Sequence, residues 1–130
     1  IKDVERDQSM TVKSKQAFYE VINKYPDSEF VEDAYLKIDI INDRLAAKEI
    51  EIARYYQFKQ QWISAINRYN KILEDYDTSV YTEEALHRLV EIYYSLGLTE
   101  EAKRYASTLG FNFPDSDWYI KSYELVKDLS

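Results

Sequence analysis

The chain has 130 residues, of which 45% are hydrophobic and 32% charged, a balance typical of one globular domain. Its net charge of -7 argues against nucleic-acid binding, which relies on basic surface, and the absence of Cys excludes disulfides and thiolate chemistry. With only two Gly and two Pro, the chain lacks the turn residues that an all-β fold requires. The composition therefore favours helices.

Apolar spacing and helix punctuation predict six helices in chain order. We expect them at about residues 9–25, 29–59, 62–75, 82–96, 99–109 and 117–129, the last acting as a C-terminal capping helix.

The second predicted helix is unusually long. Apolar residues from Val31 to Tyr56 keep near-helical spacing without Pro or Gly. About 30 residues would span about 45 Å as one helix. A break near Asn42 and Asp43 is the alternative.

Helix ends carry expected capping residues. Ser28, Thr82 and Thr99 are candidate N-caps because acidic residues follow each of them and complement the helix dipole. Gly97 suits the left-handed position after a helix.

The sequence repeats itself. AFYEVINKYPDS (17–28) aligns with RYNKILEDYDTS (68–79), and a third copy ends in FNFPDS (111–116). Pro26, Asp77 and Pro114 thus share a repeat position, at separations of 51 and 37 residues; the second is close to the tetratricopeptide period of about 34. We predict an all-α, tetratricopeptide-like α-solenoid of antiparallel helix pairs, forming one domain over residues 1–130.

Small and aromatic residues fall where such repeats pack closely. The predicted core positions of the last two units are Ile52, Ala53, Tyr56, Ala65, Tyr69, Ile72, Leu89, Val90, Tyr93, Ala102, Ala106 and Leu109. Tyr55, Tyr94, Tyr119 and Tyr123 are candidates for the surface. Trp62 and Trp118 could anchor a partner, but packing is favoured.

The parts of a catalytic or metal site are missing. Gly97 and Gly110 are isolated, so no phosphate loop is present, and the only imidazole is His87, with no nucleophile elbow nearby. Glu84 and His87 have the E-x-x-H spacing of di-iron bundles, but the second copy is absent. We interpret His87 as a surface or groove residue and Glu84 as a first-turn acid, and expect no enzyme, cofactor or metal.

The run NDRLAAKEIEIARYY (42–56), followed by Trp62 and AINRY (65–69), resembles the BamD family, also called ComL. The resemblance extends over the whole chain and is to the C-terminal half of the family. The D-R-L-A-x-x-E run is its most specific element.

The resemblance implies a longer lipoprotein on the periplasmic face of the outer membrane. It would be a scaffold of the β-barrel assembly machinery, touching the membrane only through an N-terminal lipid that this fragment lacks. Asp43, Arg44, Leu45, Lys48 and Glu49 match the region that contacts the membrane-proximal periplasmic domain of the barrel-assembly subunit, with Arg44 the strongest candidate. Accessory lipoproteins of the complex are further implied partners, without assigned residues.

The sequence therefore leaves two candidate functions for this chain. One is a docking scaffold; the other is a periplasmic adaptor that captures extended peptides in the solenoid groove. A carboxylate clamp would need Lys, Arg and Asn projecting from the first helices of successive repeats. Those helices are expected to project mainly Tyr and acids, which favours docking.

Overall fold

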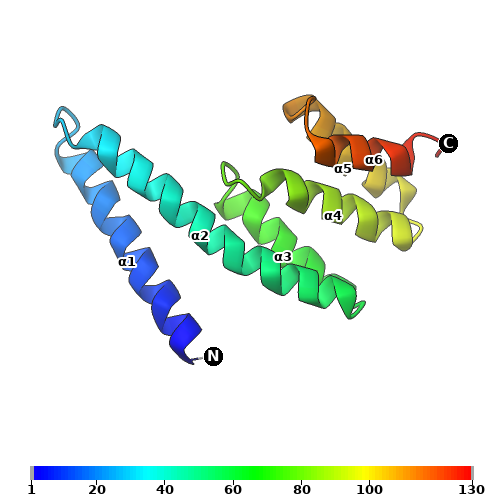
Figure 1. Ribbon diagram of the computed structural model, residues 1–130, viewed down its shortest axis with the longest axis horizontal. Coiled ribbons are helices and arrows are strands. Elements are labelled where there is room, and N and C mark those ends of the chain that lie inside the picture. The colour runs from blue at the N-terminus through cyan, green and yellow to red at the C-terminus, as the bar shows by residue number, and fades with distance from the viewer. Residues whose placement is uncertain (1, 130) are drawn as a thin grey trace. The chain divides into compact units, whose positions relative to one another are not determined.

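A computed structural model describes the backbone of residues 2–129 and the side chains of residues 11–129. This part of the chain forms six helices and no strand (Figure 1), which confirms the predicted all-α, tetratricopeptide-like class. The helices are α1 (Lys2–Lys24), α2 (Val31–Phe58), α3 (Trp62–Asp75), α4 (Thr82–Ser95), α5 (Thr99–Asn112) and α6 (Asp117–Val126). The first begins earlier than predicted; the other boundaries differ by at most three residues.

Contacts within the chain divide it into two compact units, residues 1–45 (unit 1) and 46–130 (unit 2). The boundary lies inside α2. That helix is continuous from Val31 to Phe58, so the alternative of a break near Asn42 and Asp43 is wrong. Ala46 and Ala47, two strong helix formers, follow these polar residues and favour continuation.

Unit 1 consists of α1 and the first part of α2, which run in opposite directions on either side of a turn (Figure 1). The buried hydrophobic residues of α2 in this unit are Ala34, Ile38, Ile41 and Leu45, at successive spacings of three or four. That spacing places them on one face of the helix. Phe18, Val21 and Ile22 of α1 are half-buried.

Unit 2 has its core where the second half of α2 meets α3 and α4. The buried cluster contains Ala46, Ile50, Ala53, Ala65, Tyr69, Ile72, Ala85, Leu89 and Ile92. Four of these nine residues are Ala, and short side chains let helices cross closely. The predicted core is confirmed: nine of its twelve positions are buried, and Ile52, Tyr56 and Tyr93 are half-buried.

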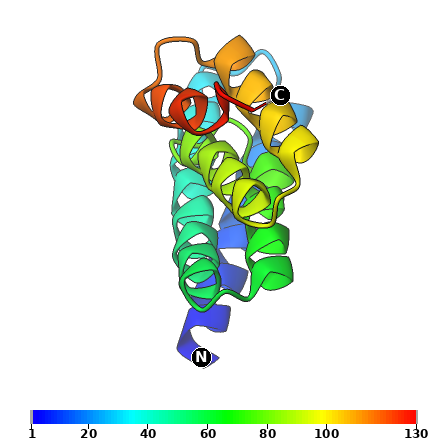
Figure 2. The same ribbon diagram turned by 90° about the vertical axis from the view of Figure 1, so that its right-hand side faces the viewer.

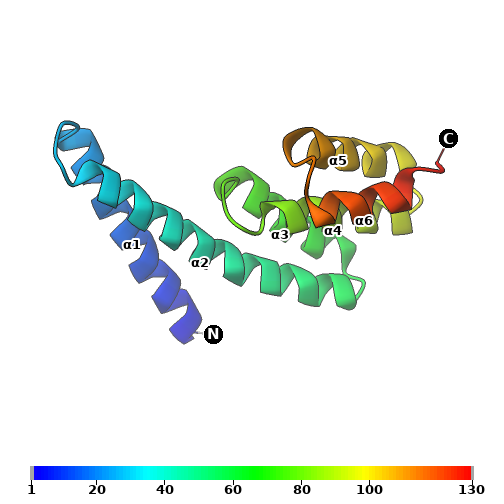
Figure 3. The same cartoon turned by 45° about the horizontal axis from the view of Figure 1, so that its top comes forward.

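The end of unit 2 is formed by α4, α5 and α6, each in contact with the other two (Figures 2 and 3). Val90, Ala102 and Ala106 form its buried cluster, and the rings of Tyr93 and Tyr105 stack with centroids 5.5 Å apart. At Gly110 an added Cβ would overlap the ring of Tyr119, so this glycine allows α6 to approach α5. Tyr119 is accordingly half-buried rather than a surface residue.

The same serine turn occurs three times, before α2, α4 and α6. In each copy the serine backbone N–H donates to a carbonyl three residues earlier, and its Oγ accepts from the N–H two residues later. The serines are Ser28, Ser79 and Ser116, with Oγ to N distances of 3.1, 3.3 and 3.1 Å. These are the serines that the repeat alignment matched.

The N-cap predictions fail at Ser28, Thr82 and Thr99. Ser28 lies upstream of Val31, where α2 begins, while α4 and α5 are preceded by Tyr81 and Leu98 without a side-chain cap. Thr82 is already helical, and its hydroxyl instead donates to the carbonyl of Asp77 at 2.9 Å. Of the three serines, Ser116 is the N-cap.

Two left-handed residues end the first helices of the repeats. Gly97 has φ 75°, as predicted, and Gln60 occupies the corresponding position after α2 with φ 59°. In both turns the next N–H bonds back over five residues, from Gln61 to Tyr56 and from Leu98 to Tyr93, each at 2.9 Å. This pattern is the Schellman motif.

Replacing Gln60 by glycine and Gly97 by alanine should change the free energy of unfolding in opposite directions. Gln60→Gly should raise the free energy of unfolding by about 0.5–1 kcal/mol, and Gly97→Ala should lower it by about 1 kcal/mol, because side chains other than glycine are strained at positive φ. No atom lies near an added Cβ at Gly97, so the effect there is conformational. Urea unfolding measures both.

The control is Gln61→Gly, one residue along, where φ is -89°. Glycine should destabilise that position because it only adds freedom to the unfolded chain. If Gln60→Gly also lowers the free energy of unfolding, Gln60 is not strained at its positive φ.

Candidate partner-binding site

The five predicted partner-binding residues share α2 but differ in exposure. Leu45 and Glu49 are buried, and Asp43 and Lys48 are half-buried. Arg44 is exposed and makes no hydrogen bond or ion pair within the part of the chain described. Of the five, Arg44 is therefore the side chain most available to a partner.

Glu49 is held within unit 2. Its Oε2 accepts a hydrogen bond from Nη1 of Arg68 on α3 at 3.0 Å, and its side chain is almost fully buried. A buried carboxylate with a strong partner on the next helix links the two helices to each other. Glu49 therefore contributes to the packing of α2 against α3. Binding through Glu49 would require breaking this pair.

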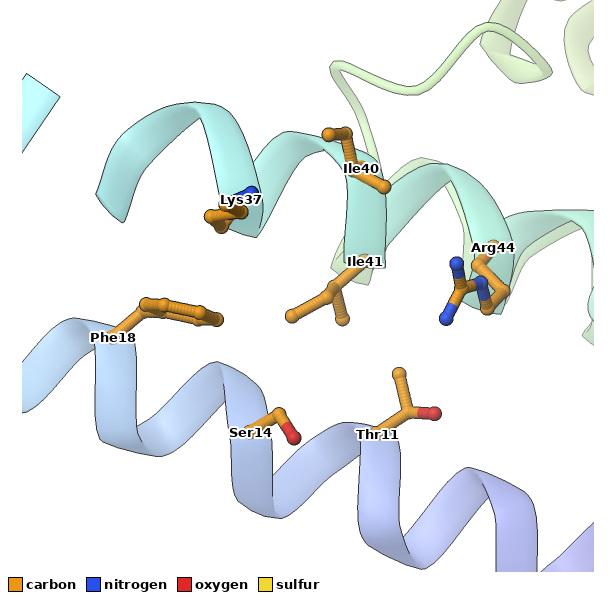
Figure 4. Close-up of a pocket in the computed structure, with 7 residues that line it drawn as sticks. All are labelled: Thr11, Ser14, Phe18, Lys37, Ile40, Ile41 and Arg44. Atoms are coloured by element: carbon orange, nitrogen blue, oxygen red, sulfur yellow. The ribbon is translucent and has the colours of Figure 1, made fainter. Parts of the chain in front are cut away.

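Arg44 borders a groove in unit 1 of about 370 Å³. The residues lining it are Thr11, Ser14 and Phe18 of α1 and Lys37, Ile40, Ile41 and Arg44 of α2. Figure 4 shows the three α1 side chains facing Ile41 and Arg44. We call this hollow the Arg44 groove.

The chemistry of the Arg44 groove suits a partner carboxylate beside an apolar side chain. A guanidinium presents a planar fork that matches a carboxylate in two places. Ile40 is more than half exposed, and Ile40 and Arg44 follow Leu36, also exposed, at intervals of four residues along one helix face. The Arg44 groove therefore combines an apolar stripe with a cation.

Unit 2 contains a polar network that the sequence interpretation did not anticipate. Glu84 of α4 is buried and accepts from Nε and Nη2 of Arg54 on α2 at 2.8 and 2.5 Å, and from Nε of Arg88 at 3.1 Å. It remains a first-turn acid, as expected, but its main role is to join α2 to α4. The i to i+4 spacing of Glu84 and Arg88 in the sequence could have predicted their ion pair. The pair with Arg54 has no such local signal, because Arg54 lies 30 residues away.

The network continues along α4. Glu91 accepts from Nη1 of Arg88 at 2.9 Å and from the amide of Gln57 at 3.2 Å, while the hydroxyl of Tyr69 donates to Gln57 at 2.7 Å. Burial raises the pKa of Tyr69 well above its ordinary value, so its hydroxyl remains a donor. The first helices of successive repeats were expected to project mainly Tyr and acidic residues. That expectation is corrected, because α2 and α4 also project Arg54 and Arg88.

His87 is buried, so its interpretation as a surface or groove residue is wrong. Its Nδ1 lies 2.7 Å from Oγ of Ser122 on α6, its Nε2 lies 3.4 Å from Glu91, and its ring packs on Trp118. The sequence contains no local signal for this position because Ser122 is 35 residues away. His87 fixes α6 against α4.

Among the other aromatic candidates, Tyr55, Tyr94 and Tyr123 are exposed, as expected. Trp62 packs against the core of unit 2, and Trp118 packs on His87 beneath Arg88 and Lys121. Both Trp residues are half-buried, in keeping with the packing interpretation.

The charges of the network stabilise the ionised carboxylates. Burial raises the pKa of Glu91, but hydrogen bonds from His87 and Arg88 outweigh it and lower that pKa to about 2. Burial also raises the pKa of Glu84, and the guanidinium groups of Arg54 and Arg88 bring it below its ordinary value. Both acids therefore remain charged at neutral pH.

The described residues contain neither a metal-binding cluster nor a membrane-spanning helix. No group of three His, Asp or Glu side chains there could hold a metal ion. No helix in that part of the chain is long and apolar enough to cross a bilayer.

Comparison with known proteins gives the family. The sequence model of a family described as outer membrane lipoprotein (YfiO) matches residues 1–109. The chain belongs to this family. The resemblance seen in the sequence is thereby confirmed.

Relatives in the family carry the name outer membrane protein assembly factor BamD. The one from Rickettsia prowazekii is 48% identical over 98% of this chain and 51% of its own length. Those from Caulobacter vibrioides and Neisseria meningitidis serogroup A are 46% and 32% identical, over 98% and 92% of this chain and 42% and 45% of their own lengths. The chain thus spans about half the length of these relatives. Their names describe assembly and not catalysis, in agreement with the expectation of a non-enzymatic protein.

Acid should weaken unit 2 through Glu91. Its pKa in the folded chain is about 2, against an ordinary value of 4.5, so its stabilising effect is present above pH 4.5 and is lost as pH falls towards 2. Glu91→Gln should lower the free energy of unfolding at pH 7 by on the order of 2 kcal/mol and approach wild type near pH 2. Urea unfolding at a series of pH values measures the difference.

The matched control is Glu124→Gln on α6, whose carboxylate is largely exposed and pairs only with Lys127. Its pH profile should parallel that of wild type. If Glu91→Gln stays parallel to wild type from pH 7 to pH 2, the network does not lower that pKa.

Proposed function

We propose that this chain is a non-enzymatic scaffold of the outer-membrane β-barrel assembly machinery. Support comes from its family and from relatives named outer membrane protein assembly factor, which match nearly all of it. It would act at the periplasmic face of the outer membrane, with lipid anchoring supplied by the longer protein. Its role is to hold partner proteins rather than to transform a substrate.

The proposed partner is the periplasmic domain of the barrel-assembly subunit nearest the membrane, and the proposed site is the Arg44 groove. The observation that carries this proposal is the exposed guanidinium of Arg44, which has no acid of its own within the described residues. An acidic side chain of the partner would complete the pair, while Ile40 supplies apolar contact.

Differences in burial support a division of roles among the five predicted residues. Arg44 is proposed to make the direct contact, with Asp43 and Lys48 beside it on α2. Leu45 and Glu49 would act by supporting the helix, because both are buried within the chain. Accessory lipoproteins of the same complex remain predicted further partners.

Reversing the charge of Arg44 should weaken docking. Arg44→Glu should reduce affinity for the periplasmic domains of the barrel-assembly subunit by about 2 kcal/mol or more, because a paired cation becomes a repelling anion. Isothermal titration calorimetry on wild type and variant measures the change. The substitution lies on an exposed helix position, so helicity by circular dichroism should be preserved.

Lys24→Glu is the control, since it makes the same charge change at an exposed position of α1 outside the Arg44 groove. Its affinity should match wild type. Equal affinities for Arg44→Glu and Lys24→Glu would reject the site. No binding by a folded wild-type chain would reject the docking partner and favour peptide capture.

A further inference from the structure

A second hollow lies in unit 2 and shares no lining residue with the Arg44 groove. It measures about 530 Å³ and lies where the end of α2, the start of α3 and one face of α4 meet. Its lining residues are Arg54, Gln57, Phe58, Gln60, Trp62, Arg88, Glu91 and Ser95. We call it the Arg54–Arg88 pocket.

The arginines that line this pocket have N–H groups that no described acceptor of the chain uses. Both oxygens of Glu84 and one of Glu91 already accept hydrogen bonds, and the other Glu91 oxygen faces His87. The amide of Gln57 is used at both its oxygen and its nitrogen. Among the described residues, Nη1 of Arg54 and Nη2 of Arg88 donate no hydrogen bond, and both arginine side chains are partly exposed. The pocket therefore offers N–H groups to a ligand that accepts.

The two arginines are fixed in position. Arg54 is held by two bonds to Glu84, and Arg88 is held by Glu84 and Glu91 and lies over the ring of Trp118 at 5.3 Å. Side chains that are already ordered lose little freedom when a ligand arrives. A carboxylate accepts strong, charge-assisted hydrogen bonds from guanidinium groups, often two at once.

Exposed apolar side chains occur in the pocket and next to its lining residues along the chain. Phe58, the last residue of α2, and Ile63, the second residue of α3, are 83% and 77% exposed, and Leu96 and Leu98, on the α4–α5 turn, are also exposed. Figures 1 and 3 show the α2–α3 and α4–α5 turns at the same end of the helices of unit 2. Apolar residues gathered around arginine and tryptophan are typical of a protein-binding surface.

We propose that the Arg54–Arg88 pocket binds an extended segment of a partner protein that carries Glu or Asp beside apolar residues. In the proposed complex, the carboxylate of that Glu or Asp accepts hydrogen bonds from Nη1 of Arg54 and Nη2 of Arg88. Phe58 and Trp62 line the pocket together with the two arginines, so a segment whose acidic residue meets the guanidinium groups also gains apolar contacts. This surface shares no lining residue with the proposed docking site and gives the chain a second binding function.

The test uses two peptides with blocked ends, acetyl-Gly-Ser-Phe-Glu-Phe-Ser-Gly-amide and the same sequence with Gln in place of Glu. Isotope-labelled chain is titrated with each, and NMR follows the Trp62 indole and the arginine Nε–H signals. Saturable shifts are expected with the Glu peptide, with affinity about tenfold higher than for the Gln peptide. Equal affinities, or no saturable shift with the Glu peptide, would overturn the proposal.

Substitutions locate the site. Phe58→Ala should weaken the Glu peptide about threefold or more, and Phe111→Ala, which removes an equally exposed ring (88%) at the end of α5, should leave its affinity unchanged. Arg44→Glu should also leave it unchanged, so the outcome is separable from that of the docking experiment. An effect of Phe58→Ala no larger than that of Phe111→Ala would place the peptide elsewhere.

Discussion

Unit 2 depends on one buried carboxylate. Glu84 lies in the first turn of α4 and is enclosed by the guanidinium of Arg54 from α2 and that of Arg88 one turn along. Removing a carboxylate from water is unfavourable by several kcal/mol unless strong hydrogen bonds replace its hydration. The ion pair therefore requires α2 and α4 to meet in one register. Gln57, Tyr69, Glu91 and His87 are placed by that register.

Arg54 and Arg88 differ from Arg44 in whether an acid of the described chain pairs with them. Arg54 and Arg88 have acids within the chain, so their first role is to hold helices together, and only their remaining N–H groups face outward. Arg44 has no such acid within the described residues. This difference in pairing separates a cation that supports the fold from one that suits a partner's carboxylate.

The D-R-L-A-x-x-E run shows why a family motif is not a list of contacts. Its Leu45 and Ala46 are buried, its Glu49 pairs with Arg68 on α3, and its Arg44 points into a groove. Neighbouring residues on a helix face different directions, so one run contains both side chains that pack within the chain and an exposed cation. The motif identifies the family; exposure decides which residue a partner can reach.

The sequence by itself determined the features that depend on local interactions. Helix extents, the repeated serine turn and the small residues at helix crossings follow from spacing and backbone preference, and so does Gly97 after α4. Only the tertiary structure decided the roles of Glu84 and His87, which meet Arg54 and Ser122 at separations of 30 and 35 residues. It also revealed the two hollows, because each is lined by side chains from different helices. Local preference fixes where a helix runs, whereas burial and pairing between distant residues arise only when helices pack.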